Sequence, residues 1–250
     1  MSGYDFRKTR LHVEAPLAEG AALALDRSKA HYLTHVLRLQ TGNRILVFNG
    51  RDGEWEAAIE TEKRGAWLHV GAKLRDQTAA ADLHYLFAPL KAARLDYMVQ
   101  KAVEMGASLL QPVLTRHGQV ARINTERMRA NCIEAAEQCG IINLPEIAEP
   151  MALFGVLSAH GAHRCLIFCD EDAEVADPVA ALAKVPANSP LSVLIGPEGG
   201  FAADERAMLL KMPNVVRLAL GPRILRADTA AVAALALVQA VCGDWRTDES

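Results

Sequence analysis

Residues 191–201 read LSVLIGPEGGF, an apolar run that passes directly into a glycine-rich segment. The run from Leu191 to Ile195 predicts a buried strand, and a helical pattern follows from Asp204. In open α/β sheets, loops of this kind gather at the carboxyl ends of strands, where ligands bind. The segment matches neither the dinucleotide fingerprint G-x-G-x-x-G nor the P-loop G-x-x-x-x-G-K-[ST]. For two glycines alone, the alternative is a plain turn between a strand and a helix.

The same alternation of strand and helix extends over the last two thirds of the chain. Further strands are predicted at residues 83–88, 109–114, 165–169 and 215–220, and helices at 94–105, 125–139, 178–185, 204–212 and from 228 onward. Five apolar strands that alternate with helices indicate an α/β domain whose parallel sheet is covered on both faces.

Residues 1–75 predict a small all-β domain. Short apolar runs at 11–13, 44–48, 54–59 and 66–70 are separated by Gly42-Asn43, Asn49-Gly50 and Asp52-Gly53, which are turn formers because they tolerate positive φ. One helix is predicted over residues 29–39, with Ser28 as its N-cap and Ala30, Leu33, Val36 and Leu37 on one face. A small barrel with one helix would close such strands. The chain is therefore predicted to divide into domains 1–75 and 76–250.

A second Gly-Pro segment, LGPRILRADTA at residues 220–230, also leaves a buried strand and enters a helix, which Asp228 or Thr229 would cap. If the two strands are adjacent, both loops line one crevice. That crevice would have a backbone-rich floor, the Glu198 carboxylate and the guanidinium groups of Arg223 and Arg226. Such groups suit a ligand with polar edges and a delocalised or developing charge.

Composition excludes some classes of protein but not an RNA partner. The 250 residues are 51% hydrophobic and 23% charged, which excludes disordered and fibrous chains. The formal charge of −3 argues against nucleic acid at first sight, because phosphate binding depends on Lys and Arg. However, residues 1–75 carry 12 basic and 9 acidic side chains, whereas residues 146–250 carry 8 and 14. The net charge therefore neither supports nor excludes RNA.

No signal peptide or membrane span is expected. The N-terminal sequence has no apolar core, and the longest apolar stretch, residues 229–242, is too short to cross a bilayer and predicts a buried helix. The five cysteines are an odd number in a chain large enough to fold without disulfides. We therefore expect a cytoplasmic protein.

Two cysteine patterns are interpreted as structural. The spacing His160-x-x-His163-x-Cys165-x-x-x-Cys169 suggests zinc, but both cysteines share a face of a predicted buried strand, where reduced Cys is common. No metal is therefore expected. Cys132 and Cys139 lie seven residues apart on one helical face and are expected in the core.

Together, GPEGGF and LGPRILRADTA closely resemble the signature of the SPOUT superfamily of methyltransferases. More narrowly they resemble the RsmE family, which methylates N3 of a uridine in the 16S ribosomal RNA of the small subunit. Other matching segments follow in order along most of the chain: HVLRL at 35–39, Gly42, FNG at 48–50, Lys91, QKAVEMG at 100–106, PVLT at 112–115 and EAAEQ at 134–138.

This resemblance implies a fold and a cofactor. The expected fold is an N-terminal PUA-like β-barrel for RNA and a C-terminal SPOUT-type α/β domain with a deep trefoil knot at about residues 191–242. The cofactor is S-adenosylmethionine, and the active site forms at a homodimer interface. Carried over by position, the cofactor residues are Leu194, Ile195, Gly196, Pro197, Glu198, Gly199, Gly200, Leu218, Leu220, Gly221, Ile224, Leu225, Arg226 and Thr229.

The expected roles of side chains follow from the chemistry of uridine. Arg226 is expected to stabilise charge on the uracil oxygens or to orient the base. Glu198 is expected to take the N3 proton or to position the base, with ordering of its loop as the alternative. The residues nominated for RNA contacts are Arg7, Arg10, Arg38, Lys91, Lys101, Arg116 and Gln138, although each alone also fits an ordinary surface residue.

The chain departs from the family pattern at four positions: Ile141 stands where Arg is frequent, Asp228 where Glu is usual, Asn43 where Asp is usual and Ala202 where Ser is usual. Ile141 removes a phosphate contact, and Asp228 keeps the charge with a shorter reach. Two alternatives stay open, a SPOUT methyltransferase acting on another RNA position and a non-catalytic RNA-binding ribosome-assembly factor. The nearly intact pair of loops weighs against the second.

Overall fold

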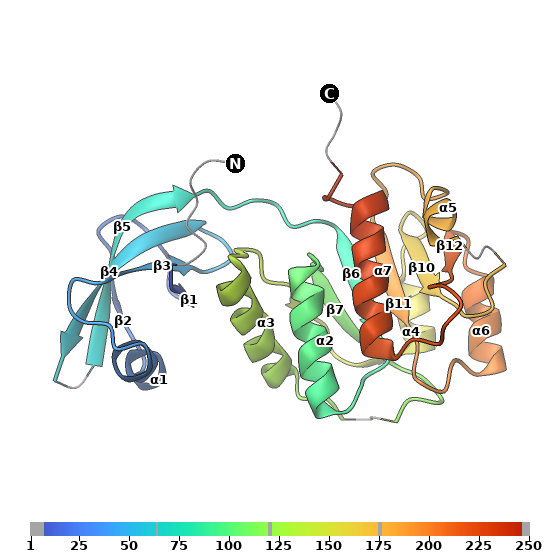
Figure 1. Ribbon diagram of the computed structural model, residues 1–250, viewed down its shortest axis with the longest axis horizontal. Coiled ribbons are helices and arrows are strands. Elements are labelled where there is room, and N and C mark those ends of the chain that lie inside the picture. Colours follow the sequence, from blue (N-terminus) through green and yellow to red (C-terminus); the bar gives the residue numbers. More distant parts are fainter. Residues whose placement is uncertain (1–7, 64, 120–121, 175–176, 247–250) are drawn as a thin grey trace. The chain divides into compact units, whose positions relative to one another are not determined.

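The chain divides into two compact units, shown in Figure 1. Unit 1 comprises residues 1–79 and 136–144, and unit 2 comprises residues 80–135 and 145–250. The structure is a computed structural model that describes residues 8–63, 65–119, 122–174 and 177–246. The predicted cut between residues 75 and 76 takes no account of residues 136–144, which belong to unit 1.

Unit 1 is built on a five-stranded sheet. Its strands, in spatial order, are β1 (Arg10–His12), β3 (Arg44–Phe48), β4 (Glu54–Glu62), β5 (Gly65–Arg75) and β2 (Ala22–Ala24). β1 runs parallel to β3, and the other neighbours are antiparallel. The strands predicted at 44–48, 54–59 and 66–70 are confirmed, and the last two extend further than predicted. The short β2 was not predicted.

Glycine is required at the turn between β3 and β4. Gly53 has a φ of +84°, a backbone conformation that side chains disfavour. A Cβ atom at this position would also lie 2.2 Å from the backbone oxygen of Arg75. The Asp52-Gly53 turn signal therefore reflects both the backbone angle and the close approach of β5.

The interior of unit 1 is apolar. Leu33, Ile45, Val47, Ile59 and Leu68 are all at most 1% exposed and pack together. Residues 136–144 add a second, smaller cluster, in which Phe48 packs with Ala136 and Ile142.

The helix of unit 1 differs from the prediction. α1 (Arg27–His31) is capped by Asp26, whose Oδ1 accepts a hydrogen bond from Lys29 N at 2.8 Å, so the predicted Ser28 cap is wrong. The helix continues as a π-helical turn, η1 (Tyr32–Val36). This wider turn changes the helical period, and Val36, predicted on the buried face, is 60% exposed.

Unit 2 contains a parallel sheet. Its strands, in spatial order, are β12 (Val215–Leu218), β10 (Cys165–Cys169), β11 (Leu191–Ile195), β6 (Leu83–Phe87), β7 (Leu109–Leu114) and β8 (Glu146–Ile147), with β9 (Met151–Ala152) also paired to β7. All these pairs are parallel. β11 is buried along its whole length, as expected for a parallel strand covered on both faces. The predicted α/β fold with a parallel sheet is confirmed.

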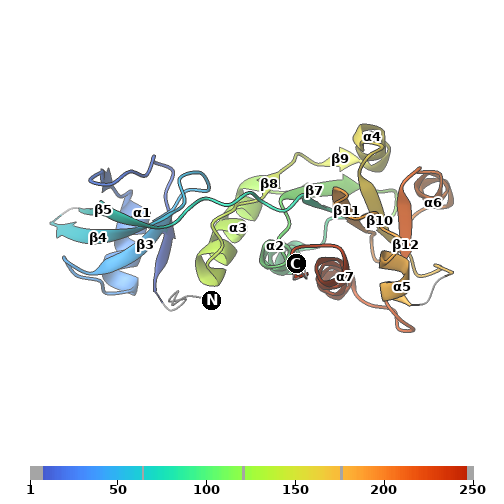
Figure 2. The same cartoon turned by 90° about the horizontal axis from the view of Figure 1, so that it is seen from above.

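Helices cover both faces of this sheet, as Figure 2 shows. One face carries α2 (Ala92–Glu104), α5 (Pro178–Leu182) and α7 (Ala227–Val241), and the other carries α4 (Leu153–Ala159) and α6 (Ala203–Leu210). α3 (Thr125–Cys139) matches its predicted bounds, whereas α4 was not predicted. The trefoil knot expected at about residues 191–242 stays a prediction.

A buried ion pair stabilises unit 1 and corrects one predicted RNA contact. Glu54 is fully buried and accepts from Arg10 Nε at 3.2 Å and from Arg75 Nε at 3.0 Å. Arg75 Nη2 also donates to Gly140 O at 2.8 Å, which ties β5 to residues 136–144. Arg10 is only 4% exposed, because its guanidinium is part of this interior network. The prediction that Arg10 contacts RNA is therefore wrong for this conformation.

We predict that Glu54→Gln lowers the free energy of unfolding of unit 1 by about 3 kcal/mol, because the substitution leaves a buried guanidinium without its counter-charge. The matched control is Glu60→Gln, whose half-exposed carboxylate pairs with His69 and is expected to cost less than about 1 kcal/mol. Urea unfolding followed by tryptophan fluorescence measures both, since Trp55 and Trp67 lie in unit 1. Equal losses in the two variants would contradict the structural role of this pair.

Candidate active site

A hollow of about 520 Å³ lies at the carboxyl ends of β10, β11 and β12. Its volume is within the range of about 300–1,000 Å³ that is usual for small-molecule sites. The lining residues are Phe168, Cys169, Asp170, Glu171, Asp172, Ile195, Gly196, Pro197, Glu198, Gly199, Gly200, Phe201, Arg206, Leu218, Leu220, Gly221, Arg223, Ile224, Leu225, Ala227 and Ala230. Both predicted glycine loops therefore face the same hollow.

The two loops line one hollow because a third strand, β10, lies between the strands that precede them. We expected one crevice if the strands before the loops were adjacent, but β10 lies between β11 and β12 and pairs with both. The condition is not met, yet both loops line one hollow. Because β10 ends between them, residues 168–172 form the floor that joins the two loops.

The first loop, residues 196–201, is ordered by side chains from distant segments. Gly200 has a φ of +67° and donates from its N–H to Pro197 O at 2.9 Å, which closes a tight turn. The His117 ring lies against this turn, with Nδ1 at 3.2 Å from both Gly199 O and Gly200 O. Since both partners are carbonyl oxygens, Nδ1 is the donor.

An ion pair also contacts this loop. The Glu198 carboxylate pairs with the guanidinium of Arg94, which lies in the first turn of α2. Both side chains are about two-fifths exposed. A carboxylate engaged in this way fits the role of ordering the loop better than that of an unpaired base.

The second loop leads into α7 and is largely exposed. Gly221 has a φ of +90°, and Ile224 is 92% exposed. The N-cap position of α7 is Arg226, which makes no side-chain capping hydrogen bond, so the predicted cap at Asp228 or Thr229 is wrong, and Asp228 lies in the first turn. A carboxylate there complements the positive end of the helix dipole without being the cap.

The floor of the hollow carries a buried carboxylate. Asp170 is 5% exposed and accepts from Arg206 Nη2 at 2.9 Å and from Arg217 Nε at 2.8 Å. Next to it, burial raises the pKa of the Cys169 thiol to about 12, so this lining thiol is neutral at physiological pH. The floor therefore offers carboxylate oxygens and an uncharged sulfur.

The predicted cofactor residues fall into two groups. Those that line the hollow are Ile195, Gly196, Pro197, Glu198, Gly199, Gly200, Leu218, Leu220, Gly221, Ile224 and Leu225. Leu194 is fully buried in the core between the sheet and α6, and Arg226 and Thr229 are exposed at the start of α7 outside the lining.

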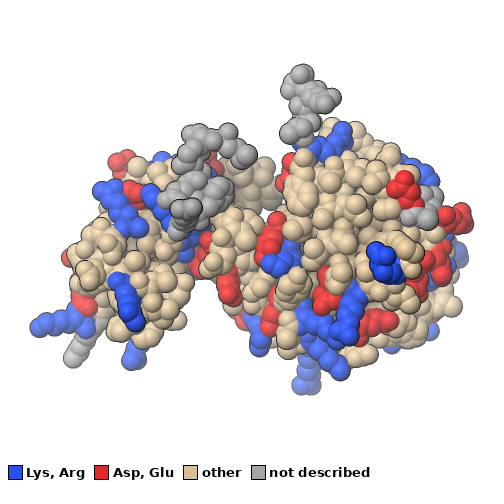
Figure 3. All heavy atoms as spheres, in the orientation of Figure 1, with Lys and Arg blue, Asp and Glu red and all other residues tan. Residues whose placement is uncertain are grey.

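The residues nominated for RNA contacts are dispersed over the chain. Arg7 lies outside the described residues. Arg38, Lys91 and Gln138 are exposed, whereas Lys101 pairs with Glu104 at 2.6 Å and Arg116 pairs with Asp204 at 2.5 Å. On the face drawn in Figure 3, basic and acidic side chains are interspersed over both units. Surface charge alone therefore marks no nucleic-acid site on this face.

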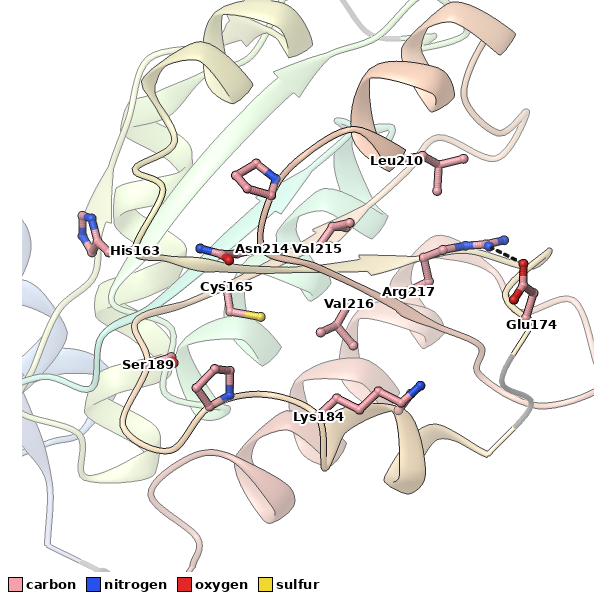
Figure 4. Close-up of a pocket in the computed structure, with 13 residues that line it drawn as sticks. His163, Cys165, Glu174, Lys184, Ser189, Leu210, Asn214, Val215, Val216 and Arg217 are labelled. Atoms are coloured by element: carbon pink, nitrogen blue, oxygen red, sulfur yellow. Dashed lines mark ion pairs between the residues drawn. The ribbon is translucent and has the colours of Figure 1, made fainter.

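A second hollow, of about 690 Å³, lies along β12 and is drawn in Figure 4. Its lining includes His163, Lys184 and Asn214, together with Arg217, which pairs with Glu174 at 3.8 Å. Neither glycine loop contributes to it, and none of the predicted cofactor residues lines it. The candidate active site is therefore the smaller hollow.

The structural interpretation of the cysteines needs one correction. Cys132 and Cys165 are buried, but Cys139, predicted in the core, is exposed at the last position of α3. Among the residues that the structure describes, no three His, Cys, Asp or Glu side chains are grouped to hold a metal ion. Over the same residues, no helix is long and apolar enough to cross a membrane.

Sequence reasoning missed Asp170, Arg206, Arg94 and His117. The acidic run that begins at Asp170 follows a predicted strand directly, and the rule that sites form at the carboxyl ends of strands could have found it. His117 and Arg94 carry no comparable signal, since they reach the loop from 82 and 104 residues away along the chain.

Comparison with known proteins agrees with this geometry. A family model described as an RNA methyltransferase domain matches residues 77–239, and one described as an RNA methyltransferase PUA domain matches residues 25–70. The ribosomal RNA small subunit methyltransferase E of Rickettsia conorii is 29% identical over 232 residues, which are 92% of this chain and 94% of that protein.

Solved structures give the same result. A protein from Legionella pneumophila, solved in complex with the bound cofactor SAM, is similar with a TM-score of 0.81 and 28% identity over 95% of this chain and 99% of that chain. The ribosomal RNA small subunit methyltransferase E of Neisseria gonorrhoeae shares the fold, with a TM-score of 0.84 and 22% identity over 96% of this chain and all of that one. The resemblance seen in the glycine loops is thereby confirmed, and the chain belongs to the RNA methyltransferase family, in its RsmE branch.

Proposed function

We propose that this chain transfers a methyl group from S-adenosylmethionine to N3 of a uridine in the 16S ribosomal RNA of the small subunit. The observation that carries the proposal is the convergence of both glycine loops on one hollow at the carboxyl ends of parallel strands. The small-subunit RNA methyltransferases similar to it over nearly their whole length support the substrate class. The SAM-bound relative from Legionella pneumophila supports the cofactor.

The lining of the hollow fits this cofactor. Its apolar side chains, such as Ile195, Leu218 and Leu225, suit an adenine ring, and exposed loop backbone suits the polar edges of that ring. The exposed Glu171 and Asp172 supply carboxylates near a ligand that carries an ammonium and a sulfonium. When bound, S-adenosylmethionine supplies an electrophilic methyl group.

The chain's own residues would then prepare the uridine. N3 of uridine carries a proton and is a poor nucleophile, so the site must stabilise negative charge on the uracil while the proton leaves. Arg226, exposed beside the hollow but outside its lining, is suited to approach the uracil oxygens without contacting the cofactor. Glu198, paired with Arg94, would order the loop that positions the methyl donor.

We also propose a homodimer that acts in the cytoplasm. Ile224 is 92% exposed at the edge of the hollow, and burial of such a side chain by a second copy would complete the site. RNA contacts are assigned to the exposed Arg38, Lys91 and Gln138, with Lys101 and Arg116 able to exchange their surface ion pairs for phosphate.

The substrate is tested by mapping methylated nucleotides in 16S ribosomal RNA by mass spectrometry, from a strain with and without this protein. The proposal expects one uridine to lose its N3 methyl group when the protein is absent and to regain it when purified protein and S-adenosylmethionine are added to small subunits. Loss of methylation at another type of position would replace uridine N3 by that position.

We predict that Arg226→Ala lowers kcat/KM for methyl transfer to small ribosomal subunits by about 100-fold, the cost of removing a donor that stabilises developing charge. Its affinity for S-adenosylmethionine, measured by calorimetry, stays unchanged because Arg226 is not part of the lining. The control is Lys211→Ala, which removes an exposed cation at the C-terminal end of α6, outside the lining of the hollow. Near-normal turnover of Arg226→Ala would remove its catalytic role.

We predict that Arg94→Ala and Glu198→Gln each weaken binding of S-adenosylmethionine by about two- to fivefold, because each breaks the same exposed ion pair. The double variant is expected to lose no more than either single variant. The pH dependence of kcat is expected to keep its shape in Glu198→Gln, since the carboxylate orders the loop. A change in that profile would instead support Glu198 as the general base.

Arg127→Ala is the control for this pair. Arg127 forms a surface ion pair with Asp96 at 2.5 Å, and neither residue lines the hollow. Its cofactor affinity should equal that of the unmodified chain.

A further inference from the structure

The exposed side of α1 and η1 carries two stacked imidazole rings. The rings of His31 and His35 are 4.5 Å apart between centroids and 19° from parallel. Both side chains are exposed, and the adjoining Val36 is 60% exposed. Their helix lies beside the strands of unit 1 (Figure 1). Each ring therefore covers one face of the other, and the stacked pair and the apolar Val36 side chain are exposed to water.

The backbone at this position is unusual in two ways. Leu37 N donates to Tyr32 O at 3.0 Å, which is the hydrogen bond between residues five apart that defines a π-helical turn. Immediately afterwards Arg38 has a φ of +55°, a left-handed conformation that a residue with a side chain rarely adopts. π-Turns and strained residues both occur preferentially at functional sites. Here they end the helix directly after the stacked rings.

A local hydrogen-bond chain fixes one of the two rings. The Thr34 hydroxyl donates its single hydrogen to Ala30 O at 2.7 Å, and Thr34 Oγ1 lies 2.8 Å from His35 Nδ1. Because the hydroxyl hydrogen is already used, His35 Nδ1 must be the donor of the second bond. The ring is therefore held in a defined orientation, with Nε2 as its remaining polar atom.

Cationic side chains accompany these rings. Arg27 and Lys29 lie on α1, and Arg38 is exposed directly after η1. Lys29 pairs with Asp26 at 3.9 Å. Exposed rings and cationic side chains on one helical segment are a combination that proteins use for single-stranded RNA, because bases stack on rings while cations contact the phosphates between them.

We infer that His31, His35 and Val36 form a stacking face for an unpaired base of single-stranded RNA, with the Arg38 guanidinium as the contact to an adjoining phosphate. The inference deepens the proposed function, on which it rests, by assigning a base-contact surface to unit 1. Stacking contacts the plane of a base and not its hydrogen-bonding edges, so it does not distinguish one base from another. The stacking face therefore anchors the RNA and does not select the methylated nucleotide.

The test compares RNA affinities of full-length variants by fluorescence anisotropy, with a labelled single-stranded RNA of about 12 nucleotides and the same RNA as a duplex. The double variant His31→Ala/His35→Ala is expected to bind the single strand about 5- to 30-fold more weakly. His31→Phe/His35→Phe, which keeps the rings, is expected to retain the affinity. His69→Ala removes an exposed imidazole of β5 from the same unit and should have no effect.

Unchanged affinity in the alanine pair, equal losses in the alanine and phenylalanine pairs, or no preference of the unmodified chain for single strands would each overturn the inference. A second measurement needs no variant, since ring-proton resonances of His31 and His35 should shift upfield when the single strand is added. Calorimetry with S-adenosylmethionine is run in parallel. If the protein binds the single strand through this face but does not bind S-adenosylmethionine, the proposed function is contradicted and the stacking face is not.

Discussion

The candidate active site depends on one constraint, the parallel pairing of β10 with both β11 and β12. β10 pairs with β11 from Cys165 to Phe168 and with β12 from Leu166 to Cys169, so all three strands end at the same edge of the sheet. Each glycine loop alone is a turn from a strand into a helix. They become two walls of one hollow because the shared strand ends between them and supplies the floor.

The end of β10 is held by charge as well as by backbone pairing. Asp170 is removed from water, and its carboxylate is paired with the guanidinium groups of Arg206 and Arg217. Arg206 belongs to the helix after the first loop, and Arg217 to the strand before the second. The same carboxylate therefore joins both loop-bearing segments to the floor of the hollow.

Sequence patterns predicted the elements that carry a continuous apolar run or a regular helical period and missed those that carry neither. β3, β10, β11 and α3 have the predicted bounds, because continuous apolar runs and helical periodicity mark them. α4 was missed since it is short and includes Gly155, and its stability comes from burying Leu153, Val156 and Leu157 against the sheet. The packing of residues 136–144 on unit 1 left no signal in the pattern of α3, which continues across residue 136.

The same difference between residues with and without a sequence signal is found within the site. The glycine loops were predictable because Gly200 and Gly221 have backbone angles that other residues disfavour. Arg94 and His117 were not, because their contacts are exposed pairings across the fold, each worth little in water. The floor of the hollow is fixed by a buried carboxylate, whereas the wall formed by residues 196–201 is held by weak, exposed contacts. Breaking an exposed contact of the first loop is therefore expected to cost less stability than breaking a pairing of the buried Asp170.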